Sequence, residues 1–562
     1  MGLLINAIVN LYRLLRNALV RVFQRPPDFV WIPVSGSLPE FEPRRRGLLR
    51  RRLAPGPSGP SLEGIRSRLD RILADGRPTG VVLRVENLGA GWASLEELRR
   101  ELERFRGRGK RVVAYLVDPG SRDFYLASSA DEIFATPLSS LNVVGISARV
   151  NFLKDALSRV GIRTEVVAVS PYKSAGDNLS RSDFSEESRE QTERLLDRRF
   201  EALVDAISAG RRISSAEARR LIDGAPYTAT AAEEKGLIDG VLYEDGLSGR
   251  LGEGGRRARL AEWSWARRAL RMPYRKRARR VVALVGVEGA IVRGKSRKLP
   301  VPLPLVGREQ AGSDSIVSAL RVAETARRVG AVLLHVDSPG GDALASDLIW
   351  REVERIRRKK PVVVLMGNAA ASGGYYVSAA ASYVVARENT VTGSIGVILT
   401  RPVTAGLLGD LGVNPVSVER GARSNLLDPR HEPTADELSV LREQLAAVYD
   451  EFKDRVVRGR GIDPATLEGL AGGRVWTGAE ALERGLVDEI GGFREALKKA
   501  RSLAGMDGED TGALLKVSVS SAARPSPGDP VREAVDVMME AFAELKAPRA
   551  WALAPYGVED DG

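Results

Sequence analysis

The chain of 562 residues contains no cysteine and only two histidines, His335 and His431. The absence of cysteine excludes disulfides, thiolate metal sites and a cysteine nucleophile. Two histidines are too few for a His-rich metal site, and a Ser-His-Asp triad could use only these two. We interpret both as structural or solvated, and we expect no metal and no cofactor. A hydrolase of this composition needs another general base, and lysine is the first candidate.

Long apolar runs are also missing from the N-terminus. A bilayer-spanning helix needs about 20 mostly apolar residues, but Arg13 and Arg16 interrupt residues 1–25 and no cleavable signal sequence is evident. The pattern has a helical period that ends at Pro26-Pro27. We predict an amphipathic helix over 1–25 that lies in a membrane interface. The alternative is a helix packed on its own domain or on another subunit. The apolar stripe consists of Leu3, Leu4, Ala7, Ile8, Leu11, Leu14, Leu15, Ala18, Leu19 and Val22.

Basic residues exceed acidic ones, 85 Lys and Arg against 73 Asp and Glu, which gives a formal charge of +12. Arginine clusters lie at 44–52 and 275–280. We find no zinc finger, aromatic RNA-binding signature or helix-turn-helix pattern, so we predict no nucleic-acid partner. The first cluster would add attraction to anionic headgroups. We interpret the second as a solvated linker.

The rest of the chain is predicted to be α/β and mostly globular, because 43% of its residues are hydrophobic and 28% charged. Strand-like apolar runs alternate with helical patterns, and segments rich in Pro, Gly or Arg separate them. The C-terminal tail fits no motif, although a strand near 514–519 and a helix near 531–545 are compatible with it. The predicted organisation is a helix at 1–25, a linker at 26–62, an α/β domain at 63–250, a basic linker at 251–280, a second α/β domain at 281–510 and a tail at 511–562.

An internal repeat relates the two predicted domains. Residues 82–89 match 333–340 at an offset of 251, and residues 227–239 match 476–488 at an offset of 249. Between them, Val112 matches Val362 at an offset of 250. Each copy reads strand–helix–strand, which predicts a parallel sheet with right-handed crossovers.

The most informative stretch is 361–376, where an apolar strand pattern breaks and Ala-Ser372-Gly-Gly follows. A serine at a strand-to-helix turn has free backbone N–H groups nearby, as a nucleophile needs for a developing oxyanion. The alternative is a serine N-cap with glycine packing. In the repeat, Ser372 corresponds to Arg122, and Lys173 corresponds to Arg423. Each copy therefore holds half of a Ser/Lys pair, which suggests an active site completed between the copies.

These segments resemble the long, tandem-domain form of signal peptide peptidase A, a membrane-associated serine protease of the Clp/crotonase-like superfamily. The resemblance covers about residues 60 to 505. Five short motifs occur in the expected places. They are Tyr172-Lys-Ser-Ala175, Ser338-Pro-Gly-Gly341, Ala371-Ser-Gly-Gly-Tyr375, Thr392-Gly-Ser-Ile-Gly396, and Val475-Trp-Thr-Gly478 with Gly485-Leu-Val-Asp488.

The resemblance implies two tandem Clp/crotonase-like ββα-superhelix domains. It makes Ser372 the nucleophile and Lys173 the general base, from the second and first domain respectively. It also implies a homotetramer that cleaves apolar peptides such as remnant signal peptides at the bacterial inner membrane. Because a spanning segment is missing, the membrane face is left open.

The chemistry of such a pair adds further expectations. Lys173 must be neutral, which burial favours, and Ser394 would orient its amine, with a turn hydroxyl as the alternative role. The N–H groups of Gly373 and Gly341 would hold the oxyanion. The neighbouring glycines, Gly340 and Gly374, would let substrate approach. We interpret Asp337 and Asp342 as capping residues.

Two other functions fit parts of the pattern. A crotonase-type acyl-CoA enzyme also uses Gly-rich oxyanion loops, but it usually places carboxylates in the pocket. A non-catalytic oligomeric membrane scaffold would keep the fold and lose the chemistry. The serine in the small turn argues against the acyl-CoA enzyme. The joint presence of Ser372, Lys173, Ser394 and both glycine turns argues against the scaffold.

Overall fold

The computed structural model describes residues 2–42, 60–274, 278–303, 307–506, 514–517 and 550–553. The chain forms two compact units. The first contains residues 1–147 and 196–277, and the second contains 148–195 and 278–559. The predicted helix at 531–545 and the arginines at 44–52 lie outside the described residues.

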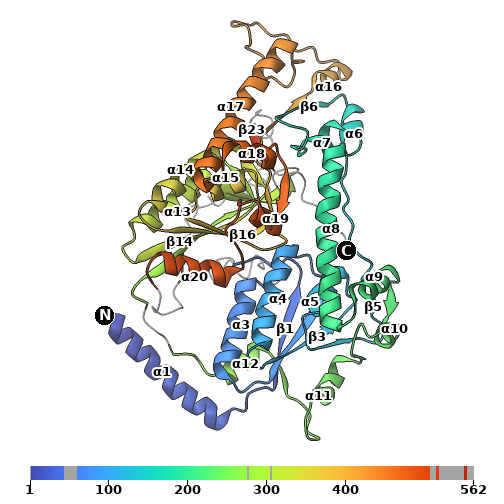
Figure 1. Ribbon diagram of the computed structural model, residues 1–562, viewed down its shortest axis with the longest axis vertical. Coiled ribbons are helices and arrows are strands. Elements are labelled where there is room, and N and C mark those ends of the chain that lie inside the picture. Colours follow the sequence, from blue (N-terminus) through green and yellow to red (C-terminus); the bar gives the residue numbers. More distant parts are fainter. Residues whose placement is uncertain are drawn as a thin grey trace. The chain divides into compact units, whose positions relative to one another are not determined.

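The first unit is built on a six-stranded parallel sheet with the order β8-β4-β3-β2-β1-β9. Side chains alternate between its two faces, because successive residues of a strand point in opposite directions. The helices α3 (Leu62–Asp75) and α4 (Trp92–Arg106) lie beside this sheet (Figure 1). Val30, Ile32 and Leu83 belong to the core cluster that contains residues of these helices, whereas Trp31 and Tyr115 belong to a separate cluster on the other face. The strands are β1 (Phe29–Ser35), β2 (Gly80–Glu86), β3 (Arg111–Leu116), β4 (Glu132–Ala135), β8 (Gly240–Val241) and β9 (Leu260–Glu262).

Helices and short elements complete the first unit. Ser61 caps α3 through the Gly64 N–H, and Gly76 ends it in the left-handed conformation that glycine favours. The elements are α3 (Leu62–Asp75), α4 (Trp92–Arg106), α5 (Ser121–Ala127), β5 (Ser140–Leu141), α9 (Ser215–Asp223), β7 (Tyr227–Thr228), α10 (Ala229–Glu234), η1 (Glu244–Gly246), α11 (Leu247–Arg250) and α12 (Trp263–Ala269). Helix α8 (Glu186–Arg211) belongs to both units, because the boundary falls within it.

Both predicted linkers contain ordered core elements, which corrects the sequence-based prediction. Strand β1 lies within 26–62, and β9 and α12 lie within 251–280. Pro33 interrupts the apolar pattern of β1 and has no N–H to donate. The pairing of β1 with β9 ends at Trp31, before Pro33. The missing N–H therefore costs no hydrogen bond to β9. In 251–280 the buried core residues are few and are separated by many arginines in the sequence: Leu251, Ala258, Ala266, Ala269 and Leu270.

Helix α1 (Gly2–Phe23) is held through its polar residues. Arg16 donates to the carbonyls of Leu270 (3.0 Å) and Arg268 (2.7 Å). Asn17 Nδ2 donates to the Met272 carbonyl (2.9 Å), and its Oδ1 accepts from the Met272 N–H (2.8 Å). The polar side of α1 therefore faces its own unit, whereas the stripe residues with a described side chain, from Ala7 to Val22, are exposed. At least half of each side chain is exposed for Ile8, Leu11, Tyr12, Leu14, Leu15, Leu19, Val22 and Phe23.

Membrane crossing is a separate question. Within the ranges given above for the structure, none of the helices combines the length and apolar composition that crossing a bilayer requires.

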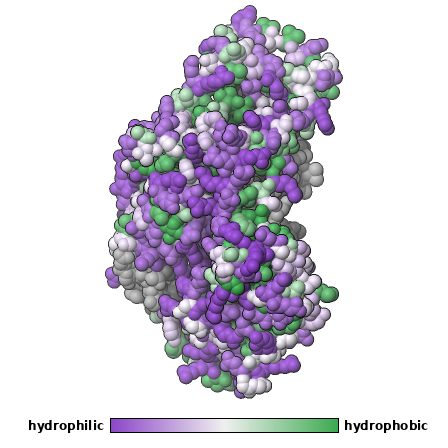
Figure 2. Space-filling view, turned by 45° about the vertical axis from the view of Figure 1, so that its right-hand side comes forward, coloured by the Kyte–Doolittle hydropathy of each residue, from purple (hydrophilic) through white to green (hydrophobic). Residues whose placement is uncertain are grey.

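The face shown in Figure 2 is mainly hydrophilic, with hydrophobic patches between charged and polar residues.

The larger sheet of the second unit has the order β20-β18-β16-β14-β10-β22, with β17 beside β16 and β21 beside β17. All its pairs are parallel except β18–β20. The α/β class with parallel sheets is thus confirmed. The strands are β10 (Val281–Glu288), β14 (Val329–Ser338), β16 (Val362–Ala371), β17 (Tyr383–Ala386), β18 (Val391–Gly393), β20 (Val475–Thr477), β21 (Glu489–Ile490) and β22 (Leu514–Lys516).

Helices cover this sheet, and α14, α15 and α20 lie against its strands (Figure 1). Thr434 and Glu437 form a capping box that begins α17, and Gly461 ends that helix in the left-handed conformation. The helices are α6 (Lys154–Ser158), α7 (Asp177–Ser180), α13 (Ser313–Thr325), α14 (Ala343–Arg357), α15 (Gly373–Ala379), α16 (Ala405–Asp410), α17 (Ala435–Arg460), α18 (Pro464–Leu470), α19 (Gly478–Glu483) and α20 (Phe493–Leu503).

A second sheet of the same unit has the order β12-β13-β11-β15-β23-β19-β6. Strand β6 pairs antiparallel with β19 from Arg163↔Val403 to Ala168↔Ile398, and this pairing joins residues 148–195 to the second unit. The compact units therefore differ from the predicted boundary at residue 250. The strands are β6 (Arg163–Ala168), β11 (Ala290–Val292), β12 (Arg297–Leu303), β13 (Gly307–Gly312), β15 (Gly340–Asp342), β19 (Ile398–Val403) and β23 (Ala550–Leu553).

Candidate active site

Ser372 occupies the sharp turn between β16 and α15. Its backbone has φ 54° and ψ −114°, an unusual conformation for a residue with a Cβ. The turn is fixed from both sides, because the Ser372 N–H donates to the Gly393 carbonyl (2.8 Å) and its carbonyl accepts from the Tyr376 N–H (2.8 Å). The side chain does not cap α15. Ser372 therefore occupies the N-cap position without using its hydroxyl as a cap, and the hydroxyl instead lies within hydrogen-bond distance of Lys173 Nζ.

Lys173 meets this hydroxyl inside the second unit. Its Nζ lies 2.7 Å from Ser372 Oγ and 2.9 Å from both the Oγ and the carbonyl oxygen of Ser394. The three side chains are buried, with 1% of Lys173 exposed. The two side chains come from different copies of the repeat, Lys173 from the first and Ser372 from the second, and both lie within one compact unit of the chain.

Electrostatics at this site favour a neutral amine. Burial lowers the pKa of Lys173 well below its ordinary value. The groups that face Nζ are two hydroxyls and a carbonyl, which solvate an amine without fixing a positive charge by ion pairing. With its amine neutral, Lys173 can accept a proton from Ser372.

Ser394 follows β18 and has a second strained backbone, with φ 50°. Its N–H donates to the Arg474 carbonyl (2.7 Å), so the turn is tied to the segment before β20. The Ser394 hydroxyl faces Lys173 Nζ at 2.9 Å. The Ser394 hydroxyl can therefore orient the Lys173 amine, as expected. A hydroxyl that only stabilised its own turn would not contact Lys173.

Two glycines that sequence reasoning missed shape the space around Lys173. A Cβ on Gly473, where φ is +90°, would lie 2.7 Å from Lys173 Cα. A Cβ on Gly396 would lie 3.4 Å from Lys173 Cδ. Gly396 belongs to a motif quoted above, and Gly473 follows another glycine just before β20. Both glycines therefore stand in recognisable glycine-containing segments of the sequence. Nothing in those segments indicates that they lie against Lys173.

Gln191 on α8 is another functional candidate that was not predicted. Its Nε2 donates to the Tyr172 carbonyl (3.1 Å), and its Oε1 accepts from the Val475 N–H (2.9 Å). The side chain thus joins the backbone just before Lys173 to β20, which pairs with β18. Gln191 lies in a long charged helix pattern, and nothing in that pattern distinguishes it.

The predicted oxyanion glycines lie next to each other. A Cβ on Gly373 would lie 3.1 Å from the Gly341 nitrogen and 3.2 Å from Gly340 Cα. A Cβ on Gly341 would lie 2.0 Å from the Ile291 carbonyl oxygen, and one on Gly374 would lie 2.7 Å from that of Ser338. The glycine turns at 340–341 and 373–374 therefore pack backbone to backbone, and the second of them directly follows Ser372 in the chain.

The two aspartates flanking the first glycine turn have structural partners. Asp342 caps α14 through the Ala345 N–H (2.8 Å), which confirms the capping interpretation for this residue. Asp337 begins no helix and instead accepts from the Ala369 N–H (3.0 Å), so it joins β14 to β16. Burial raises the pKa of Asp337.

The histidines also have partners in the described structure. His335 is buried on β14, and its Nδ1 lies 3.4 Å from Glu288 Oε1. His431 Nε2 lies 2.9 Å from Glu437 Oε2 near the beginning of α17. These contacts agree with the structural role that the sequence suggested for both.

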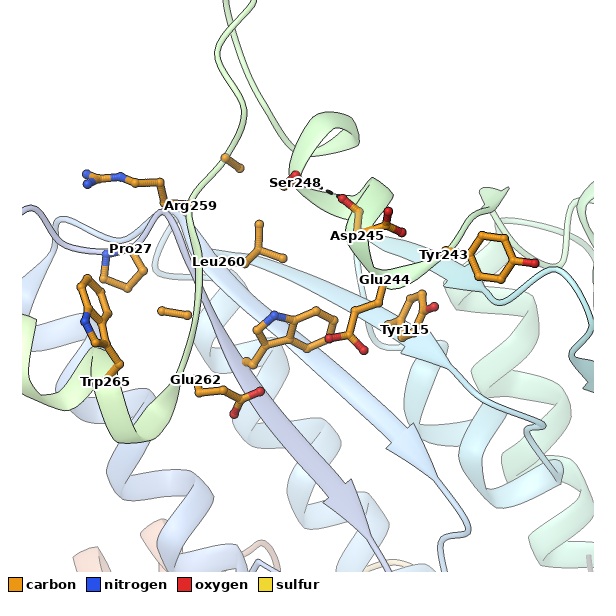
Figure 3. Close-up of a pocket in the computed structure, with 13 residues that line it drawn as sticks. Pro27, Tyr115, Tyr243, Glu244, Asp245, Ser248, Arg259, Leu260, Glu262 and Trp265 are labelled. Atoms are coloured by element: carbon orange, nitrogen blue, oxygen red, sulfur yellow. Dashed lines mark hydrogen bonds between the residues drawn. The ribbon is translucent and has the colours of Figure 1, made fainter.

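A cavity of about 1340 Å³ in the first unit contains none of the predicted site residues (Figure 3). Aromatic walls and the carboxylates Glu244, Asp245 and Glu262 line it, and Ser248 donates its hydroxyl to the Asp245 carbonyl (3.3 Å). The acyl-CoA alternative would need carboxylates that serve the pocket beside the glycine turns. The two aspartates there, Asp337 and Asp342, accept backbone hydrogen bonds, and the carboxylates of this cavity belong to the other unit.

Comparison with known proteins identifies the family. The profile of Peptidase family S49 matches residues 104–254 and 354–507. Serine protease SPPA, chloroplastic, of Arabidopsis thaliana is 33% identical over 479 residues, which are 83% of this chain and 69% of that protein. Protease 4 of Haemophilus influenzae is 33% identical over 436 residues, 74% of this chain and 68% of that protein. A putative signal peptide peptidase SppA of Enterococcus faecium is 38% identical over 203 residues, 35% of this chain and 59% of that protein. The chain belongs to peptidase family S49 and is a serine protease.

Proposed function

We propose that this protease hydrolyses peptide bonds in apolar peptides, such as remnant signal peptides, with a Ser372/Lys173 dyad. The observation that carries the proposal is the 2.7 Å distance between Lys173 Nζ and Ser372 Oγ in a buried site. Among the residues that the structure describes, no carboxylate forms an ion pair with this amine. A relative named signal peptide peptidase supports the substrate class.

The reaction follows from these positions. Neutral Lys173 accepts the Ser372 hydroxyl proton while Oγ attacks the substrate carbonyl carbon and forms a tetrahedral oxyanion. Collapse breaks the C–N bond, and the Lys173 ammonium gives its proton to the leaving amine. Water then attacks the carbonyl carbon of the acyl-enzyme while neutral Lys173 accepts a proton from the water. The C–O bond to Ser372 breaks, Lys173 returns a proton to Ser372 Oγ, and the carboxylic acid product leaves. Ser394 orients the amine throughout without adding charge.

In this proposal the N–H groups of Gly373 and Gly341 stabilise the oxyanion, and Gly340 and Gly374 allow close approach of the substrate backbone. Support comes from the packing of the two glycine turns beside Ser372. Such donors typically contribute about 10²–10³-fold in kcat each.

The tandem arrangement and the assembly are part of the proposal. The family profile matches the chain twice, at 104–254 and 354–507, which supports two Clp/crotonase-like domains. Lys173 falls in the first match, and Ser372 and Ser394 fall in the second. We extend the family resemblance to a homotetramer, which native mass spectrometry would test.

The nucleophile can be tested directly. A biotinylated fluorophosphonate, which loses fluoride when a serine Oγ attacks phosphorus, is expected to label Ser372 in the detergent-solubilised protein. Tandem mass spectrometry of the digested protein locates the modified residue. Ser372→Ala should lose the label and the hydrolysis of apolar peptides, whereas the nearby control Ser382→Ala should keep both. Labelling of a different serine, or hydrolysis that survives in Ser372→Ala, would reject the dyad.

We also propose that α1 contacts membrane lipid and localises the enzyme to the bacterial inner membrane. Its polar side is bonded to the backbone of residues 268–272, so its exposed residues present an apolar strip outward. Such a helix can lie in the headgroup region with its apolar face buried.

The lipid contact predicts a defined loss of binding. Replacing Leu11 and Leu15 together by glutamine should reduce binding to vesicles of phosphatidylglycerol and phosphatidylcholine by about 10²-fold or more, since each buried leucine contributes roughly 1.5–3 kcal/mol. Vesicle co-sedimentation measures the effect. Leu138→Gln, at an exposed leucine outside α1, is the control. Equal binding of all three proteins would contradict the lipid contact.

A further inference from the structure

The cavity shown in Figure 3 lies on the face of the first sheet that is opposite to α3 and α4. Trp31 of β1 and Tyr115 of β3 line it, and both belong to the core cluster on that face. Their rings meet edge to face with centroids 6.0 Å apart, and 7% of Trp31 and 3% of Tyr115 are exposed. The bottom of the cavity is therefore aromatic and is held in place by the sheet.

The internal repeat indicates why this face is open. Helix α20 packs against β14 and β16, the strands that correspond to β2 and β3. At the repeat offset of 249, the eleven residues of α20 correspond to residues 244–254. There the chain forms η1 and the four-residue α11, whose Leu247 belongs to the cluster of Trp31. The first sheet thus has a shorter cover at this place than the second sheet, and the cavity lies beside that cover.

Carboxylates stand close to the aromatic bottom of the cavity. Glu262 of β9 is opposite Trp31 in the pairing of β9 with β1, so both side chains point to the same face of the sheet. Glu244 extends from η1 and lies beside Tyr115 (Figure 3). Asp245 follows it in the chain and lines the cavity as well. A ligand in this cavity therefore meets aromatic rings and negative charge together.

Basic groups neutralise these carboxylates only in part. Arg259 is the one basic residue among the thirteen lining residues, all of which the structure describes. Outside the lining, Arg84 Nη1 lies 3.5 Å from Glu244 Oε2, but about half of each side chain is exposed. An ion pair that is so exposed contributes little. The cavity wall therefore keeps an excess of negative charge.

An arginine side chain matches this combination of groups. Aromatic faces attract a guanidinium, which is planar and also binds carboxylates through its N–H groups. The aliphatic stem of arginine packs on apolar surface, and Pro27, Ala258 and Leu260 supply such surface here. The volume of about 1340 Å³ exceeds the roughly 300–1,000 Å³ of most small-molecule sites, so a peptide segment with more than one side chain can enter.

We propose that this cavity binds arginine side chains of the peptide substrate. The site belongs to the first unit, whereas Ser372 lies in the second. The inference rests on the proposed function, because a signal peptide carries a positively charged segment before its apolar segment. The apolar segment would then be cleaved at the Ser372 site, and the basic segment would add affinity without taking part in the chemistry.

Isothermal titration calorimetry with the detergent-solubilised full-length Ser372→Ala protein tests the binding without hydrolysis. The probe is acetyl-Ala-Arg-Ala-Arg-Ala-amide, and the control peptide has citrulline, a neutral analogue of the same shape, in place of both arginines. The citrulline peptide should bind at least about 10-fold more weakly, because it lacks the charge that the rings and carboxylates attract.

Two double variants in the same background locate the site. Glu244→Gln with Glu262→Gln should weaken binding of the arginine peptide by about 10-fold, and both side chains are exposed, so the fold should persist. Glu234→Gln with Glu253→Gln removes the same charge from exposed residues outside the lining and should leave binding unchanged. Equal weakening in the two double variants would show a general effect of net charge and would overturn the inference.

Hydrolysis by the active protein gives an independent readout. An apolar peptide preceded by two arginines should have a KM about 10-fold lower than its citrulline counterpart, with similar kcat, and Glu244→Gln with Glu262→Gln should remove this difference. Equal binding of the two probes, or equal KM of the two substrates in wild type, would overturn the inference and leave the proposed function intact. Selective binding of the arginine probe without any peptide hydrolysis by wild type would reject the proposed function instead.

Discussion

Lys173→Met is expected to lower kcat for peptide hydrolysis by about 10⁴-fold, at the upper end of what a positioned general base contributes. Methionine fills similar volume in the site but cannot take the Ser372 proton. Steady-state hydrolysis of an apolar peptide measures the loss. Ser372→Ala should lose at least as much activity, and the double variant should be no worse than Ser372→Ala, because the two groups act as a unit. Lys154→Met, an exposed lysine of the same segment, is the control.

The same variant should gain stability at neutral pH. The pKa of folded Lys173 is lowered, whereas the unfolded chain has an ordinary lysine pKa of about 10.4. Between these two pKa values the unfolded state binds a proton that the folded state does not, so wild-type stability rises with pH in that window. The variant lacks this dependence. Its Tm advantage should therefore be largest toward the acidic end of the window and shrink as pH approaches about 10.4.

Calorimetry across this pH range, together with kcat/KM profiles, checks the argument. Wild-type kcat/KM should rise with pH through the lowered pKa of Lys173, because only the neutral amine is a base. A Tm difference that is constant with pH would show that Lys173 is charged in the folded protein. That result would remove it as the general base at neutral pH.

Gly473→Ala is expected to lower kcat by about 10²-fold while the protein stays folded. The added Cβ would lie 2.7 Å from Lys173 Cα, and φ is +90° there, so the Lys173 segment must move. A displacement of about 1 Å in a catalytic group can reduce the rate by this factor. Gly469→Ala is the matched control, because a Cβ there meets nothing within 4 Å. Peptide hydrolysis and thermal unfolding should be measured on the same samples.

An unchanged kcat in Gly473→Ala, with Tm lowered, would argue that Lys173 does not act from the position described. Equal losses of kcat in Gly473→Ala and Gly469→Ala would indicate a general effect of substitution near β20. Only a selective loss in Gly473→Ala supports the view that this glycine makes room for the base.

The sequence predicted the parallel α/β character because buried strands such as 362–366 leave a continuous apolar run. It also singled out Ser372, whose strand-to-turn setting is local. The repeat drew attention to Lys173, but its role as the base came from the family resemblance, since its environment is made by the long-range pairing of β6 with β19. Gln191 was missed for the same reason, because its partners at 172 and 475 are far apart in the sequence.

The linkers were mispredicted for a different reason. Strand β1 and helix α12 have short apolar patterns, and many prolines and arginines surround them in the sequence. The prediction followed this linker-like composition and gave too little weight to the short periodic patterns. Burial against a sheet formed by distant strands decides their structure. Strand β23 is an extreme case, because four residues gain their extended form from β15 and β19, which lie well over a hundred residues earlier.

The backbone of the two hydroxyl residues has an evolutionary consequence. Ser372 and Ser394 both have φ near +50°, where residues with a side chain are strained by about 1–3 kcal/mol each. Glycine would relieve that strain at either position and would remove the hydroxyl at the same time. Selection for thermostability alone would therefore drive both positions toward glycine. Serine at these two sites is a local mark of selection for activity against the preference of the fold.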